Sequence, residues 1–269
     1  MLDNRKIEIR IEADAFRKKC NISGYKIIDL FQECKNMGYK LLRYPIDEEE
    51  NLGFALKKED DIVIFTNTSS RLSREIFTLA HEIGHVILHF HNSSSFMDTA
   101  QTISNMTTDE LEEEANFFAA CLLMPNEELD KFLILSVKEF EKNGLTAMDI
   151  ARLMSEFNVS FDMALNRLEN LGKIDIRTRT LLNNQKCEMR VGNLLRAVDG
   201  NAKLNEASKT IDLPYEFIEY AIYNYNHNAI PKETVERVLA CYNLTWDDVS
   251  ESLNTPSTDV DSMLGEEEN

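Results

Sequence analysis

The pattern of apolar and polar residues predicts one short β-region within an otherwise helical chain. Residues 14–37 have a helical pattern, with a possible break at Ser23-Gly24. Acidic runs then separate three short apolar segments that predict strands: residues 39–44, 53–57 and 62–66. Because the connections are too short for parallel crossovers, we expect these strands to form a small antiparallel sheet.

The pattern after the strands predicts helices almost to the end of the chain. Apolar residues cover a broad face of residues 73–89, a polar loop follows over 91–108, and a second helix over 109–124 ends before Pro125. A pair of helices follows over 146–172. These elements predict an α+β fold that is mostly helical, with a small three-stranded antiparallel sheet beside the helix 73–89 and a C-terminal all-α domain.

The composition changes after Lys173 and indicates a second domain. Residues 185–269 contain 7 Lys and Arg against 16 Asp and Glu. We therefore predict a first domain over 1–175 that includes the helical pair, an acidic helical domain over 185–254, and a disordered acidic tail over 255–269.

The predicted second domain has the layout of a degenerate helix-turn-helix. Its would-be recognition helix, Tyr215 to Tyr225, contains Glu216 and Glu219 and no basic residue. Because reading DNA normally needs the opposite charge, we expect a protein-contact or structural role for this domain.

Composition and charge set limits on the class of protein. The formal net charge of -18 repels a nucleic-acid backbone, so direct nucleic-acid binding is not expected. No apolar run is long enough for a membrane span, and the first residues do not form a signal-peptide core. The five cysteines are widely spread and include no CxxC pair. We expect a soluble, cytoplasmic protein with reduced thiols.

The segment His81-Glu82-Ile83-Gly84-His85 carries the main chemical signal of the sequence. On a helix, histidines at i and i+4 lie on one stripe, which suits two nitrogens about 2.0–2.1 Å from a shared zinc ion. Glu82 points about 100° round the helix, from where it can reach a zinc-bound water without binding the metal. The motif therefore predicts a metal centre with His81 and His85 as ligands and Glu82 as general base.

Two positions compete for the role of third ligand. His91 has the separation of an HExxHxxGxxH pattern, but Leu88 replaces the glycine that would let the chain turn back to the metal. The alternative is a glutamate of the next helix, where Glu112 and Glu114 flank an apolar stripe. We favour Glu112, keep Glu114 as the reserve, and expect Asn116 to hydrogen-bond a ligand histidine.

Two further residues and one strand have expected roles outside the ligand set. His89 lies on the stripe of the two ligand histidines, and we expect it to stabilise the end of its helix through the macrodipole. Cys121 is expected in the core. The strand ending at Thr66 could align a substrate backbone if it lies at the sheet edge.

Two stretches of sequence resemble the ImmA/IrrE family of zinc metallopeptidases. They are FTLAHEIGHVILH, residues 77–89, and EEEANFFAACLLMP, residues 112–125. The resemblance extends over roughly residues 20–172. The long acidic C-terminal domain is a departure from it.

The resemblance implies both residues and function. It assigns the metal ligands to His81, His85 and Glu112 and the catalytic role to Glu82. It also implies a zinc-dependent endopeptidase that cleaves a regulatory protein, a helix-turn-helix repressor, in transcriptional regulation in phages, mobile elements or stress responses. The alternative function is a non-cleaving, metal-stabilised anti-repressor or toxin-antitoxin component that acts by binding its partner.

Overall fold

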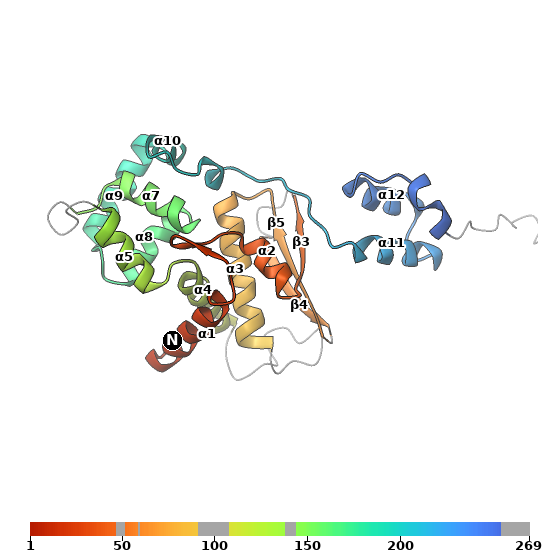
Figure 1. The fold of residues 1–269 in the computed structure, drawn as a ribbon, viewed down its shortest axis with the longest axis horizontal. Coiled ribbons are helices and arrows are strands. Elements are labelled where there is room, and N and C mark those ends of the chain that lie inside the picture. The colour runs from red at the N-terminus through yellow and green to blue at the C-terminus, as the bar shows by residue number, and fades with distance from the viewer. Residues whose placement is uncertain (47–51, 59, 91–107, 138–143, 254–269) are drawn as a thin grey trace, which may run out of the picture. The chain divides into compact units, whose positions relative to one another are not determined.

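The computed structural model describes residues 1–46, 52–58, 60–90, 108–137 and 144–253 (Figure 1). The predicted loop at 91–108 lies outside these residues except for residue 108. The predicted tail at 255–269 and His91 lie outside them entirely. The chain divides into two compact units, Met1–Asp212 and Leu213–Asn269, and each has a hydrophobic core of its own.

The N-terminal region differs from the single helix predicted over 14–37. Helix α1 (Asp3–Arg17) begins earlier, and a two-stranded ribbon of β1 (Ile22–Ser23) and β2 (Lys26–Ile27) separates it from α2 (Leu30–Asn36). Gly24 makes the ribbon turn with a φ of 60°, a conformation that glycine adopts without strain. The Asp29 side chain then caps the first turn of α2. The expected break at Ser23-Gly24 is therefore a full reversal of the chain.

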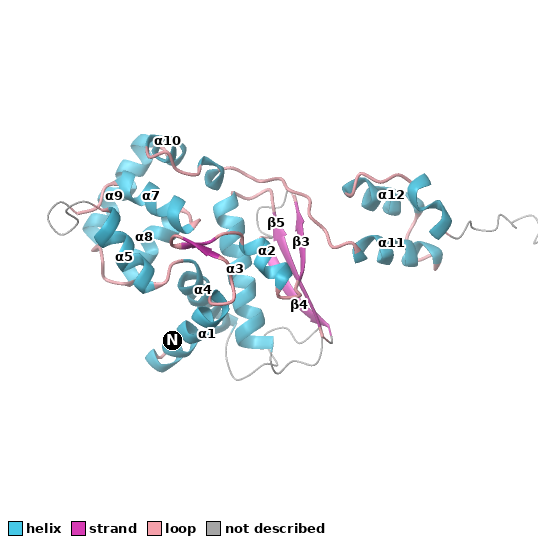
Figure 2. Cartoon of the chain, in the orientation of Figure 1, coloured by secondary structure: helices cyan, strands magenta, loops and turns pink. Residues whose placement is uncertain are grey.

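The three predicted strands form a sheet, which Figure 2 shows in magenta, but the sheet is mixed and not antiparallel. Strand β5 (Asp61–Asn67) pairs antiparallel with β4 (Gly53–Lys58) and parallel with β3 (Lys40–Tyr44). Each short connection does reverse the chain, as expected. After two reversals β5 runs in the direction of β3, and because it lies between β3 and β4 it pairs with β3 in parallel. Because β5 is the central strand, its predicted role as a substrate-aligning edge is wrong.

Helix α3 (Leu72–His89) lies between the sheet and α4 (Thr108–Leu123), as Figure 1 shows. Its broad apolar face is buried, with Leu79, Ala80 and Ile83 fully inaccessible to solvent. Burial of three such side chains removes a large apolar area from water and fixes the rotation of α3 about its axis.

The remaining helices of the first unit extend the same core. They are α5 (Asn126–Ser136), α7 (Ala147–Phe157), α8 (Phe161–Asn170), α9 (Ile176–Met189), α10 (Val191–Ala197) and the 3-10 helix η2 (Ala202–Asn205). Thr146 and Asp149 form a reciprocal capping box at the start of α7, which explains why a helix begins there. Leu182, Leu194 and Leu204 are buried in the cluster that also contains the α3 side chains.

Residues 206–212, which we call the 206–212 segment, run beside β3 and the start of α3. Arg43 of β3 and Asp212 exchange backbone hydrogen bonds of 2.8 and 2.9 Å. The Leu72 N–H donates to the Glu206 carbonyl at 2.8 Å. This segment therefore satisfies backbone groups of both an edge strand and a helix N-terminus.

A buried carboxylate reinforces this attachment. Glu75 is fully inaccessible to solvent and accepts hydrogen bonds from the Arg43 guanidinium, the Thr66 hydroxyl and the Ser208 hydroxyl. A buried charge needs such partners, because it has lost its hydration. The network joins β3, β5, α3 and the 206–212 segment.

The boundary between the units lies later than the sequence indicated. Residues 185–212, predicted to begin the second domain, belong to the first unit because α9, α10 and the 206–212 segment pack within it. The second unit contains α11 (Glu216–Asn226), α12 (Lys232–Cys241) and the 3-10 helix η3 (Asp247–Ser252) around Ile218, Val235 and Leu239. Among the described helices of both units, none combines the length and apolar character of a membrane span.

Candidate metal centre

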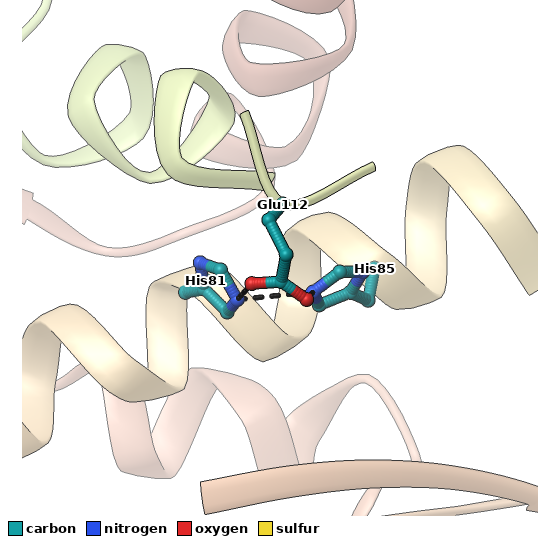
Figure 3. A group of neighbouring side chains, drawn as sticks. All are labelled: His81, His85 and Glu112. Carbon is teal, nitrogen blue, oxygen red and sulfur yellow. Dashed lines mark hydrogen bonds and ion pairs between the residues drawn. The ribbon is translucent and has the colours of Figure 1, made fainter. Parts of the chain in front are cut away.

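The side chains of His81, His85 and Glu112 converge between α3 and α4 (Figure 3). The two Nε2 atoms lie 2.9 Å apart, and the Glu112 carboxylate oxygens lie 3.1 Å from His81 Nε2 and 3.3 Å from His85 Nε2. One ligand atom from each residue can be chosen so that all lie within 4.8 Å of one another. The three residues predicted as ligands are therefore adjacent in space.

A close approach of the two helices brings the glutamate to the histidines. A Cβ placed on Gly84 would lie 3.2 Å from both the Cα and the carbonyl oxygen of Ala115, and 3.1 Å from Phe118 Cδ1. Only the absence of a side chain at Gly84 allows α4 to lie this near. Glu112 is one turn before Ala115, so this contact sets its distance from the imidazoles.

Both imidazoles have partners that orient them. His81 Nδ1 lies 3.1 Å from the Asn116 amide oxygen, and since that oxygen only accepts, the ring nitrogen donates. The predicted contact between Asn116 and a candidate ligand histidine is thus present. Burial lowers the pKa of His81, and burial together with the neighbouring imidazoles lowers the pKa of His85 to about 3. Both rings are therefore neutral at pH 7, and since His81 carries its hydrogen on Nδ1, its Nε2 lone pair is available to a metal.

Glu82 lies beside this group but has a different environment. It is buried, and burial, followed by the charge of Glu112, raises the pKa of its carboxyl group to about 7. The backbone N–H of Ala55 on β4 donates to the carboxylate and partly opposes that shift. A Cβ on Gly53, also on β4, would lie 3.5 Å from Glu82 Oε1. The start of β4 thus approaches the carboxylate closely, and its sequence carries no chemical motif that indicates this.

The reserve ligand Glu114 lies away from the group. Its buried carboxylate pairs with Arg5 of α1 and hydrogen-bonds His89 Nε2 at 3.2 Å. His89 is also buried, and its Nδ1 lies 3.1 Å from His85 Nδ1. The expected action of His89 on the helix macrodipole stays a prediction, and in addition its ring nitrogens contact the side chains of Glu114 and His85. Its place one turn after His85 was a signal in the sequence for this contact.

The donor set fits a metal ion of the zinc type. Zinc in proteins binds imidazole nitrogens and carboxylate oxygens, and catalytic sites use three protein ligands with a further position for solvent or substrate. His81, His85 and Glu112 provide two neutral imidazoles and one carboxylate oxygen in a single group. These residues could hold a divalent metal beside a buried glutamate.

A helix with an HExxH motif, packed on a small sheet and joined by a glutamate of the next helix, defines a metallopeptidase-type protein. The model of the Peptidase_M78 family, described as the IrrE N-terminal-like domain, matches residues 34–169, about half of the chain. The chain belongs to this family, which confirms the resemblance to ImmA/IrrE proteins and supports a peptidase with a protein substrate. A search of curated proteins found no match.

Proposed function

We propose that the chain is a zinc-dependent endopeptidase, with His81, His85 and Glu112 as zinc ligands and Glu82 as the catalytic base. The convergence of the three candidate ligands within 4.8 Å, with Glu82 buried beside them, is the observation that carries this proposal. Membership of a peptidase family supports it independently.

The residues around Glu82 suit proton transfer to and from water. A zinc ion in the group would polarise the scissile carbonyl and acidify the attacking water. Glu82 would take the proton of that water at a carboxylate oxygen and later deliver it to the leaving amine. Burial, the main cause of its raised pKa, makes the Glu82 carboxylate a stronger base than an exposed glutamate, which suits a group that takes up a proton and releases it again. The Ala55 N–H holds the carboxylate in place from β4.

The proposed substrate is a regulatory protein, a helix-turn-helix repressor. The resemblance to ImmA/IrrE peptidases supports this choice. The net charge of -18 also favours association with a protein that has a basic, DNA-binding surface. Helix α11 contains Glu216 and Glu219 and no Lys or Arg, which supports a protein partner for the second unit over DNA.

The test combines metal content with cleavage of a purified helix-turn-helix repressor, taken from the neighbouring gene where that gene encodes one. The wild-type chain should contain about one zinc per molecule and cleave the repressor, and chelation should stop cleavage. Glu82→Gln should keep the zinc and lower the cleavage rate by roughly 10²–10⁴-fold. Glu113→Gln is the matched control, since Glu113 lies on α4 outside the ligand group and its carboxylate pairs with the N-terminal amine.

Two results would count against the proposal. A chain that binds no zinc would remove its basis. Wild-type cleavage by Glu82→Gln would remove the assigned base. Full anti-repressor activity of Glu82→Gln without any cleavage would instead establish the alternative, a metal-stabilised protein that acts by binding its partner.

A further inference from the structure

His89 links the candidate metal centre to the first helix of the chain. Its Nδ1 lies 3.1 Å from His85 Nδ1, and its Nε2 lies 3.2 Å from Glu114 Oε2. The Glu114 carboxylate in turn accepts two hydrogen bonds from Arg5, from Nε at 2.8 Å and from Nη2 at 2.7 Å. The His89 and Glu114 side chains are only 5% and 4% exposed, so water does not replace these contacts.

The direction of each hydrogen bond follows from the chemistry of Glu114. Arginine has only donors, so a carboxylate held by Arg5 at both oxygens stays ionised and accepts. His89 Nε2 must therefore carry the hydrogen that it shares with Glu114. In a neutral ring the other nitrogen, Nδ1, then has a free lone pair and accepts.

This polarity determines the tautomer of His85. Since His89 Nδ1 accepts, the contact of 3.1 Å requires His85 Nδ1 to donate. A neutral His85 with its hydrogen on Nδ1 has its lone pair on Nε2, and Nε2 is the atom that faces His81 and Glu112. The reverse polarity would put a hydrogen on Nε2 and block binding of a metal.

We propose that Arg5, Glu114 and His89 form a positioning network that fixes the Nδ1–H tautomer and the ring orientation of His85. The proposal rests on the proposed function for the role of His85 as a ligand. None of the three residues is itself a candidate ligand: His89 contacts His85 at Nδ1, and Glu114 and Arg5 act on His85 through His89. Arg5 lies on α1, outside the residues 34–169 that match the family, so this part of the network comes from a helix that the family match does not include.

The test uses Glu114→Gln and Arg5→Gln in the full-length chain. Glutamine at 114 has one acceptor oxygen, for which Arg5 and His89 would compete, and its amide can donate to His89 Nε2 and reverse the polarity. Arg5→Gln removes the guanidinium from a side chain that is 34% exposed, so the fold should tolerate it. Glu113→Gln makes the same chemical change one residue away on an exposed carboxylate and is the matched control.

Two measurements are made on every variant. Nitrogen-15 NMR of the histidine rings in the metal-free protein reports the His85 tautomer, and competition with a chromophoric chelator reports zinc affinity. We expect Glu114→Gln to shift His85 from the Nδ1–H towards the Nε2–H tautomer and to weaken zinc binding by roughly 10- to 100-fold. Arg5→Gln should change the His85 tautomer and the zinc affinity in the same direction by a smaller factor. Arg5→Lys should keep most of the wild-type zinc affinity, and Glu113→Gln should match wild type in both measurements.

The two readouts separate this proposal from the one on which it rests. If both network variants keep the wild-type tautomer, the network does not fix His85 and the proposal is overturned. An unchanged zinc affinity in Glu114→Gln would also overturn it. If the wild-type chain binds no zinc, the proposed function fails, while the tautomer of the metal-free protein still decides for or against the network.

Discussion

Replacement of Gly84 by alanine should loosen the metal centre without unfolding the protein. The added methyl would lie 3.2 Å from the Cα and carbonyl oxygen of Ala115 and 3.1 Å from Phe118 Cδ1. The Phe118 ring can move, but the Ala115 backbone moves only with α4. Because carbon atoms pack best about 3.5–4.0 Å apart, α4 must withdraw by roughly 0.3–0.5 Å or more.

That displacement is small for the fold and large for a metal site. Overpacking costs about 1–3 kcal/mol, while alanine gains about 1 kcal/mol over glycine in a helix interior, so the net loss of stability should be about 0–2 kcal/mol. Metal–ligand distances, by contrast, tolerate only about 0.2 Å. Glu112 moves with α4, and we expect zinc affinity to fall by about 10-fold, equivalent to about 1.4 kcal/mol.

Chelator competition and urea unfolding would measure these two quantities separately. Gly192→Ala is the matched control, because it makes the same change in helix α10, where the nearest atoms to the new methyl are 3.7 and 3.9 Å away. Zinc affinity of Gly84→Ala equal to that of wild type would refute the argument that the approach of α4 to α3 places Glu112.

Three further predictions concern the sheet and the C-terminal region. Gly53→Ala should lower the free energy of unfolding, measured in urea, by about 1–3 kcal/mol, since the added methyl would lie 2.5 Å from Thr78 Cγ2. Combining it with Thr78→Ser, which removes the Thr78 methyl group, should restore part of that loss. Glu75→Ala should cost about 3–5 kcal/mol, because it leaves the Arg43 guanidinium, whose side chain is only 12% exposed, without its carboxylate; a loss below about 1 kcal/mol would contradict the assigned pairing. A chain that ends at Asp212 should keep the zinc affinity of the full chain, whereas one that ends at residue 205 should have a lower melting temperature, because the second chain lacks the 206–212 segment.

The parts of the site that could be predicted from sequence depend on local helix geometry. His81, Glu82 and His85 lie on one helix, so their mutual arrangement follows from the helical repeat alone. Glu112 and Glu114 both flank the apolar stripe of α4, and Glu112 could be favoured because Asn116 lies one turn after it on the same side of the helix. The positions of the three strands could also be predicted from local sequence, because each is a short apolar run bounded by polar residues.

The parts that could not be predicted depend on contacts between distant residues. The sheet is mixed because β5 lies between β3 and β4. Short turns reverse the chain in the same way whether the strand order is β3-β4-β5 or β3-β5-β4, so they do not predict the order. The pairing of Arg5 with Glu114 joins residues that are 109 positions apart, and nothing local to either one indicates it. A change of composition after Lys173 does not report which helices pack together, and the structure divides into its two units at Asp212.

The 206–212 segment also affects how the protein behaves towards other copies of itself. Strand β3 lies at an edge of the described sheet, and an unprotected edge is a template for pairing with strands of other molecules. By hydrogen-bonding to Arg43, this segment occupies part of that edge from within the same chain. A recombinant fragment trimmed to the family match, residues 34–169, would lack this cover, and we expect such a fragment to aggregate where the longer chain stays in solution.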